Sequence, residues 1–257
     1  MNRAAFYAAL RKRDSGVFGT SLSQSQVDGL ERLLSAVNGR PVSHAAYLLA
    51  TAYHETGYTM QPIREAYGKS DGDTINRLER AWKAGKLPQV RTPYWRPDAT
   101  GKAWFGRGYV QLTHRDNYAK AAAITGVDLL GDPSQAMNPE VAAKILVEGC
   151  ESGMFTGSRL GQYLPGDYVG ARRVINGQDR AQQIATYAKA FEKALVAAGY
   201  SVTAKSAKPL STPGPVVPNG NPVGWSIGVL IAAAGAVFWK FACSVPVLAG
   251  LFSSCGN

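Results

Sequence analysis

The composition changes abruptly at Ser201, and this break constrains the fold more than any other feature. Residues 201–223 contain five prolines, two charged residues and no aromatic residue, a composition typical of an extended, semi-rigid linker. Residues 225–252 then contain a single charge, Lys240, and about 20 apolar residues are enough for a helix to cross a bilayer. The sequence therefore predicts a globular domain at 1–200, a linker at 201–223 and a transmembrane anchor helix within 224–257.

The hydrophobic segment carries features that suit a membrane interface. Trp225 and Trp239 are of the residue type enriched at the two faces of a bilayer, and the Gly- and Ala-rich stretch between them allows close helix packing. Lys240 interrupts the segment, so we expect its charge at an interface. Two alternatives stay open: residues 201–223 as a loop packed on the domain, and residues 225–252 as the core helix of a second small domain.

The first 200 residues show mainly helical periodicity. Apolar residues recur three and four positions apart, as on the buried face of a helix. Ser43 and Asn138 suit N-caps, and Gly57 suits the residue just after a helix end. Residues 109–113 alternate in polarity like a short strand, while 82–104 is irregular. Helices are expected over 22–37, 43–55, 117–126, 139–152 and 179–199.

Two glutamates are candidates for acid and base. Glu55 falls in the last turn of the predicted helix 43–55, where the helix dipole disfavours an anion and should raise the carboxyl pKa. Glu65 follows Pro62 and adjoins Arg64, whose guanidinium would keep Glu65 ionised. Two carboxyls in opposed environments are what cleavage of a glycosidic bond requires, because one protonates the leaving oxygen and the other activates water.

These residues also allow interpretations other than an acid and a base. Either glutamate could be solvated at the surface, the commonest environment for this residue type. His54-Glu55 also begins the zinc-protease pattern, which needs a second His four residues after the first. Position 58 is Tyr, so that pattern fails. We therefore predict no metal site and no cofactor.

The two glutamates belong to an ordered set of motifs. The set comprises Ala52-Tyr53-His54-Glu55-Thr56-Gly57, Gln61-Pro62-Ile63-Arg64-Glu65, Gly106-Arg107-Gly108-Tyr109-Val110-Gln111-Leu112-Thr113, Asn117-Tyr118, Gly126-Val127-Asp128-Leu129-Leu130 and Arg173-Val174-Ile175-Asn176-Gly177 with Arg180. Between about Val42 and Leu195 the chain resembles glycoside hydrolase family 19, the chitinase-like group that includes many phage endolysins. The resemblance implies a mainly α, lysozyme-like α+β domain with a short β-hairpin, and an inverting mechanism.

The resemblance also implies roles for individual residues. Glu55 matches the general acid, Glu65 the second carboxylate of the short, phage-type members, and Thr113 the hydroxyl that helps to hold the attacking water. Contacts to the sugar are implied for Gln111, Asn117, Asn176, His54 and Tyr109, and support of the carboxylates for Arg180. Plant-type members place their second glutamate further from the first, so Glu79 is the alternative to Glu65.

The net charge of +10 suits an anionic polymer or surface such as a bacterial envelope. No predicted helix has a dense Arg/Lys face with interleaved aromatic residues, so nucleic acid is not an expected partner. Cys150 is expected as a reduced buried thiol. Cys243 and Cys255 could pair, which the sequence leaves open.

Together these features predict a peptidoglycan-degrading glycoside hydrolase of a bacterial virus, cleaving β-1,4 bonds between amino sugars. The N-terminus, residues 1–13, is basic and amphipathic and does not read as a secretory signal. We expect the protein in the virion or at the host envelope membrane, held by residues 225–252, with other virion proteins as candidate partners. The alternatives are a chitinase and a virion membrane protein whose domain only docks on glycans.

Overall fold

A computed structural model describes residues 1–202 of the protein. The predicted anchor and residues 203–223 of the predicted linker, and with them Cys243 and Cys255, lie outside this range. Within it, no helix is both long and apolar enough to cross a bilayer. The described chain is mainly helical with one small sheet, which agrees with the predicted mainly α class. The sheet is not the predicted short β-hairpin, because its two strands come from segments far apart in the sequence.

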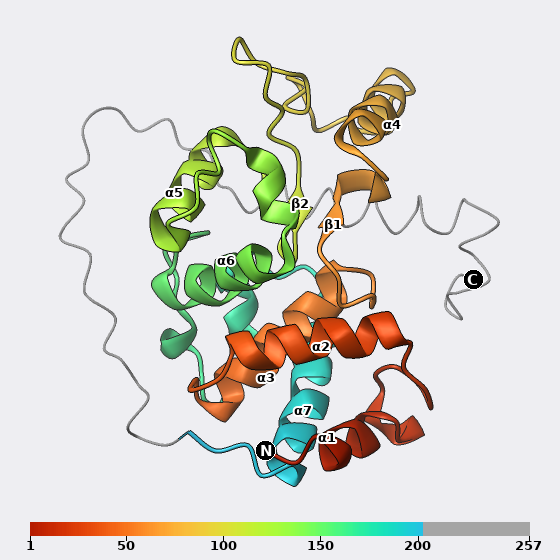
Figure 1. The fold of residues 1–257 in the computed structure, drawn as a ribbon, viewed down its shortest axis with the longest axis vertical. Helices are drawn as coiled ribbons and strands as arrows, with labels where there is room; N and C mark the ends of the chain where they lie inside the picture. Colours follow the sequence, from red (N-terminus) through yellow and green to blue (C-terminus); the bar gives the residue numbers. More distant parts are fainter. Residues whose placement is uncertain (203–257) are drawn as a thin grey trace.

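The described residues form seven α-helices and two short strands (Figure 1). The helices are α1 (Arg3–Leu10), α2 (Gln24–Ala36), α3 (Val42–Glu55), α4 (Asp71–Lys83), α5 (Arg115–Thr125), α6 (Pro139–Ser152) and α7 (Ala181–Ala197). Strands β1 (Ile63–Arg64) and β2 (Arg107–Gly108) pair antiparallel, with Ile63 opposite Gly108 and Arg64 opposite Arg107. Short 3-10 turns at Glu65–Tyr67 and Gly170–Val174 follow β1 and precede α7.

The main core surrounds α3. Every residue of this helix from Ser43 to Tyr53 is buried, because α7, α2 and α6 pack around it. The sequence predicted one buried face, and the structure instead encloses the helix on all sides. Ser43 was also wrongly predicted as the N-cap: Pro41 precedes the helix and Ser43 lies buried inside its first turn. Gly57, in contrast, has the left-handed backbone (φ +57°) expected just beyond a helix end.

A second, smaller core lies around α4 and the irregular segment 84–106. Leu78, Leu87, Val90, Trp95 and Phe105 form its centre, and Trp95 has no exposed surface. In Figure 1 this part stands above the β1–β2 pair, while α1, α2, α3 and α7 lie below it. The irregular segment was predicted, although Trp82 belongs to the end of α4.

The predicted strand at 109–113 is wrong in its position. Arg107 and Leu112 exchange two backbone hydrogen bonds, N–H to O at 3.2 and 2.9 Å, so the residues between them form the turn of a tight loop. Gly108 (φ +86°) and Gln111 (φ +51°) turn the backbone in a way that an extended alternating strand cannot. The pairing strand is the two-residue β2, just before this turn.

The helix ends agree with the sequence to within two residues. Helix α6 spans Pro139–Ser152 as predicted, and the Asn138 side chain accepts hydrogen bonds from the N–H groups of Glu140 and Val141. Helices α2, α5 and α7 begin within two residues of their predicted starts. Cys150 is a buried free thiol, as expected.

Candidate active site

Glu55, the last residue of α3, forms an ion pair with Arg172. Arg172 Nη1 lies 2.6 Å from Glu55 Oε1, and the two side chains are 3% and 11% exposed. Arg172 Nε also donates to the carbonyl oxygen of Asp179, at 3.1 Å. The turn Gly170–Val174 thereby places a buried cation at the carboxyl end of α3, where the helix dipole alone would disfavour the Glu55 anion.

The pKa of Glu55 reflects two opposed influences. Burial is the largest influence and raises it, but the positive charge of Arg172, the adjacent His54 imidazole and the Arg172 hydrogen bond together outweigh burial and hold the pKa below its ordinary value. The sequence predicted a raised pKa from the helix position alone. That prediction is wrong, because the arginine that decides the direction comes from a segment 117 residues away.

Glu65 occupies a different environment, directly after β1. Glu65 is only 8% exposed. Oε1 accepts a hydrogen bond from Tyr94 Oη at 2.5 Å and Oε2 accepts one from the Gly106 N–H at 2.8 Å. The Glu65 N–H donates in turn to the Gly106 carbonyl oxygen, at 2.8 Å. The carboxyl is therefore fixed between the irregular segment 84–106 and the start of β2.

Burial raises the pKa of Glu65, and the hydrogen bonds from Gly106 and Tyr94 and the positive charge of Arg107 only partly offset it. We expected Arg64 to keep this carboxyl ionised. Arg64 instead donates to Asp71 Oδ1, at 2.7 Å. The two glutamates thus have opposed pKa shifts, as the sequence suggested, but each in the direction predicted for the other.

Gln111, Thr113 and Asn117 lie together at the turn after β2, all partly buried. Gln111 Nε2 donates to the Ile63 carbonyl oxygen at 3.0 Å, and a Cβ added to Gly106 would lie 2.7 Å from Gln111 Oε1. Thr113 Oγ1 donates to the Gln111 carbonyl oxygen at 2.7 Å, and Asn117 Nδ2 to that of Thr113 at 2.8 Å. Through Ile63 and Gly106, this cluster adjoins the segment that carries Glu65.

His54 precedes Glu55 in α3, the Asn176 N–H donates to the carbonyl oxygen of Arg172 at 2.9 Å, and Arg180 acts on the charge of His54. Asn176 is 2% exposed, and its Nδ2, like His54 Nδ1, is buried without a hydrogen-bond partner among residues 1–202. Burial lowers the pKa of His54, and the nearby charges of Arg172 and Arg180 add to that effect. The imidazole is therefore neutral at pH 7.

Tyr109 is placed differently from the prediction. It has no exposed surface, and its hydroxyl donates to the Met60 carbonyl oxygen at 3.3 Å. A side chain in the core cannot contact a sugar, so we drop Tyr109 from the candidate binding residues.

Glu79, the alternative to Glu65, has structural partners. Its carboxylate accepts hydrogen bonds from Arg96 Nη2 at 2.8 Å and from Trp95 Nε1 at 3.1 Å. These contacts hold α4 against the irregular segment and leave Glu65 as the second candidate carboxyl. In the described part of the chain no three His, Cys, Asp or Glu side chains gather as a metal site would require.

Sequence reasoning missed two residues of this site, Arg172 and Tyr94. We expected Arg180 to support the carboxylates, but the ion pair to Glu55 comes from Arg172, the residue just before the motif that begins at Arg173. Tyr94, which donates to Glu65, lies in an irregular segment where no periodicity indicates its direction. Both contacts join segments distant in sequence, so only the folded chain reveals them.

Comparison with known proteins supports the resemblance. Residues 37–147 match the family model of glycoside hydrolase family 19, chitinase class I. Chitinase 12 of Oryza sativa subsp. japonica is 51% identical over 91 residues, which cover 35% of this chain and 26% of that protein. The chain thus spans about a quarter of the length of this curated relative. The match supports a family 19 glycoside hydrolase domain in the chain.

Among solved structures, chitinase C from Streptomyces griseus HUT6037 is similar at 22% identity with a TM-score of 0.45, covering 77% of this chain and 76% of that one. A bacterial family 19 chitinase is similar at 23% identity with a TM-score of 0.45, covering 77% and 94%.

Proposed function

We propose that the family 19 domain hydrolyses β-1,4 bonds between amino sugars of peptidoglycan in a single inverting displacement, with Glu55 as general acid and Glu65 as general base. The observation that carries this proposal is the pair of mostly buried carboxyls with opposed pKa shifts inside the segment that matches the family model. Inverting hydrolysis needs two such groups, one to protonate the leaving oxygen and one to activate water.

Glu55 must carry a proton before it can donate one. The ion pair with Arg172 keeps it ionised, against the effect of burial. We propose that bound sugar draws Arg172 away from Glu55. Burial would then dominate and raise the Glu55 pKa, so that the carboxyl takes up a proton next to the glycosidic oxygen.

Glu65 and Thr113 would hold the attacking water. A raised pKa makes Glu65 a stronger base once it is ionised, and the contacts from Tyr94 and Gly106 fix its orientation. Thr113 donates its own hydrogen to the Gln111 carbonyl oxygen, so the hydroxyl oxygen remains able to accept a hydrogen bond from water. Gln111, Asn117, Asn176, His54 and Arg180 remain the proposed sugar-binding residues.

The choice of peptidoglycan rests on charge. The chain carries a net charge of +10, which raises the local concentration of an anionic polymer. The peptides and attached polymers of a bacterial wall are anionic, whereas chitin is neutral. Chitin is the second candidate, favoured by the similarity of one segment to a plant protein named chitinase.

Two substrates separate these candidates. Purified sacculi and colloidal chitin would be incubated with the full chain in detergent, and new reducing ends counted. Faster release from sacculi, with a rate that falls as salt is added, supports peptidoglycan. Release from chitin alone would favour the chitinase. No release from either substrate would support a domain that only docks on glycans.

A second experiment assigns the two carboxyls. An oligosaccharide with a nitrophenyl leaving group needs little protonation, so Glu55→Gln should keep much of its activity on that substrate and lose about 10²–10⁴-fold on sacculi. Glu65→Gln should lose activity on both substrates. Added azide should restore cleavage of the nitrophenyl substrate by this variant, because azide takes the place of the attacking water. The reverse pattern would give the acid role to Glu65.

We propose that residues 225–252 anchor the domain in a membrane, that 201–223 tether it within reach of the wall, and that the protein serves a bacterial virus in breaching or lysing its host. The test is whether purified virions contain this chain and clear peptidoglycan in a gel overlay; virions without the chain would remove the virion setting.

A further inference from the structure

The two-stranded sheet places two arginines opposite one another beside Glu65. Arg64 in β1 and Arg107 in β2 are partners in the strand register, and like charges at directly opposed positions destabilise a sheet. The next pair along consists of Glu65 and Gly106, joined by hydrogen bonds of 2.8 Å in both directions. A group that neutralises the charges of the two arginines therefore lies next to Glu65, the candidate base.

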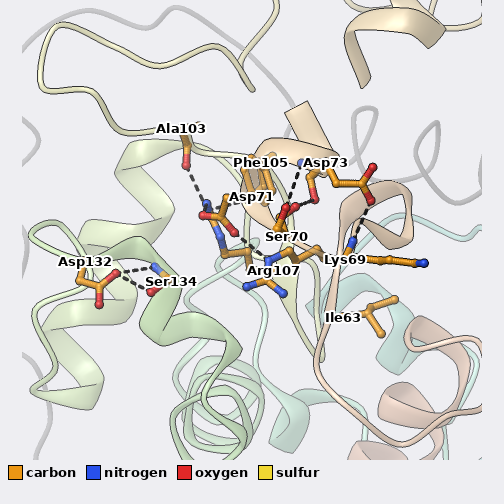
Figure 2. Close-up of polar contacts among 12 residues, drawn as sticks. Ile63, Lys69, Ser70, Asp71, Asp73, Ala103, Phe105, Arg107, Asp132 and Ser134 are labelled. Carbon is orange, nitrogen blue, oxygen red and sulfur yellow. Dashed lines mark hydrogen bonds and ion pairs between the residues drawn. The ribbon is translucent and has the colours of Figure 1, made fainter. Parts of the chain in front are cut away.

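Asp71, the first residue of α4, binds both arginines with separate oxygens. Arg64 Nε lies 2.7 Å from Oδ1, and Arg107 Nη2 lies 2.7 Å from Oδ2. Figure 2 shows Asp71 facing the Arg107 guanidinium. We call the three side chains Arg64, Asp71 and Arg107 the clamp. It joins both strands to the start of α4 through one carboxylate.

Arg107 also fixes the backbone that leads to Gly106. Its side chain is 1% exposed, and Nη1 donates to the Ala103 carbonyl oxygen at 3.0 Å and to Tyr118 Oη at 2.8 Å. The guanidinium carbon lies 3.6 Å from the centre of the Phe105 ring, and Figure 2 shows Ala103 and Phe105 beside it. The segment that provides the Gly106 N–H to Glu65 is thus fixed by the contacts of Arg107 with Ala103 and Phe105.

We propose that Asp71 is a positioning residue for the second carboxyl, acting through Arg64 and Arg107 to fix the place and the charge environment of Glu65. This inference rests on the proposed function for its catalytic consequence. Asp71 neutralises one of the two facing cations and leaves Arg107 able to fix Gly106. Loss of the Asp71 anion and loss of the Arg107 cation should therefore change the charge around Glu65 in opposite directions.

The groups that face Glu65 determine the direction in which each substitution should shift its pKa. They are Tyr94 from the irregular segment, Arg107 from β2 and Tyr118 from α5, and Arg107 is the one permanent charge among them. Asp71→Asn removes the anion that balances Arg107, so the Glu65 pKa falls. Arg107→Gln removes the cation, so the Glu65 pKa rises.

The experiment reads the Glu65 carboxyl directly. Carbon-13 NMR titration of glutamate side chains in the full chain, in detergent micelles, would follow Glu65, assigned by its absence in Glu65→Gln. The clamp predicts opposite pKa shifts for Asp71→Asn and Arg107→Gln. Asp73→Asn is the matched control, since Asp73 lies in the same helix turn and pairs with Arg77; it should leave Glu65 unchanged.

Kinetics on sacculi provide the second readout. Asp71→Asn should lower kcat about tenfold or more with little change in KM, because a small displacement of a reacting group is costly, and Asp71→Glu should restore part of it. Should Asp71→Asn not fold, Arg64→Gln, whose side chain is 24% exposed, removes one cation and should raise the Glu65 pKa. Shifts of one sign in all variants, or none, overturn the clamp. Opposed shifts in a protein without hydrolytic activity would support the clamp and refute the proposed function.

Discussion

At the scale of single residues, the candidate site depends on how a buried charge is balanced. Glu55 and Arg172 are both largely buried and contact each other at 2.6 Å. Such a pair adds little net stability over an apolar pair, but the removal of one partner leaves the other unpaired in a medium of low dielectric constant. Among residues 1–202 no counterion contacts Glu65, and burial therefore raises its pKa.

Arg172→Met should therefore destabilise the fold strongly. The buried Glu55 carboxyl would lose its counterion, with an expected loss of about 3–5 kcal/mol in the free energy of unfolding at pH 7, and the Glu55 pKa should rise. Urea denaturation measures the first and carbon-13 NMR the second. Arg173→Met is the control, because Arg173 is adjacent and exposed. An equal loss in both variants would contradict the ion pair.

The two glutamates should also differ in the pH dependence of stability. The Glu65 pKa is raised in the folded state, so its contribution is greatest below the unfolded pKa and declines as pH rises through the folded pKa. Glu65→Gln removes that decline, so its Tm should exceed that of the wild type increasingly from acid to neutral pH.

Glu55 has the opposite sign. Its folded pKa is lowered, so its contribution is present above the unfolded pKa and is lost as pH falls through the folded pKa. Glu55→Gln should therefore be less stable than the wild type near neutral pH and approach it in acid. Thermal melts of both variants from acid to neutral pH test the signs together, and parallel curves would show that burial, rather than ionisation, sets both effects.

At the scale of elements, the sequence predicts the helices well and the sheet poorly. The Asn138 cap and the Pro139 start identify α6 to the residue, because a cap is a local interaction between neighbours in sequence. The strand at 109–113 fails because its alternating polarity arises from a tight turn, in which Gln111 adopts a positive φ. Two-residue strands contain too few positions for any period to appear.

The sequence carries signals for the two candidate carboxyls and none for their contact partners. Glu55 and Glu65 carry motif and position signals in the sequence, and both are placed in mostly buried polar environments. Arg172 and Tyr94 contact them across 117 and 29 residues. A pKa inferred from the local helix alone consequently has the wrong sign at Glu55, and charge partners decide it only after folding.

The packing of α2 provides a test at this scale. A Cβ at Gly29 would lie 1.9 Å from the Met60 carbonyl oxygen, in the segment that leads into β1 and Glu65. Gly29→Ala should therefore separate α2 from this segment and cost about 1–3 kcal/mol of stability, measured by urea denaturation. Gly72→Ala in α4 is the matched control, since a Cβ added at Gly72 would have no described atom within 4 Å. A stable Gly29→Ala variant would show that the close approach is not required.

At the scale of the whole molecule, the described residues form one main core with a smaller one around α4. Tyr200, near the end of the described chain, still donates to the carbonyl oxygens of Val37 and Arg40, at 2.7 and 3.0 Å. The folded domain therefore includes Tyr200, and the predicted domain end at residue 200 stays a prediction.

A chain truncated after Val202 should keep its Tm and its activity on sacculi, because the core and both carboxyls lie within residues 1–202. The full chain should remain with membranes after a carbonate wash, while the truncated chain should be released. Release of both chains would contradict a membrane anchor at 225–252. Loss of activity in the truncated chain alone, with its Tm unchanged, would show that the tail contributes to chemistry rather than to location.

Glu55 and Glu65 are proposed to act on opposite faces of one sugar ring in a single displacement. Proton NMR of a peptidoglycan oligosaccharide, recorded during the first minutes of hydrolysis, measures the anomeric configuration of each new reducing end before it mutarotates. Because the bonds cleaved are β, an inverting displacement by water produces the α anomer first, and the β anomer should appear only as the sugar equilibrates. The β anomer appearing first would mean a covalent intermediate, and would contradict the roles assigned to both glutamates.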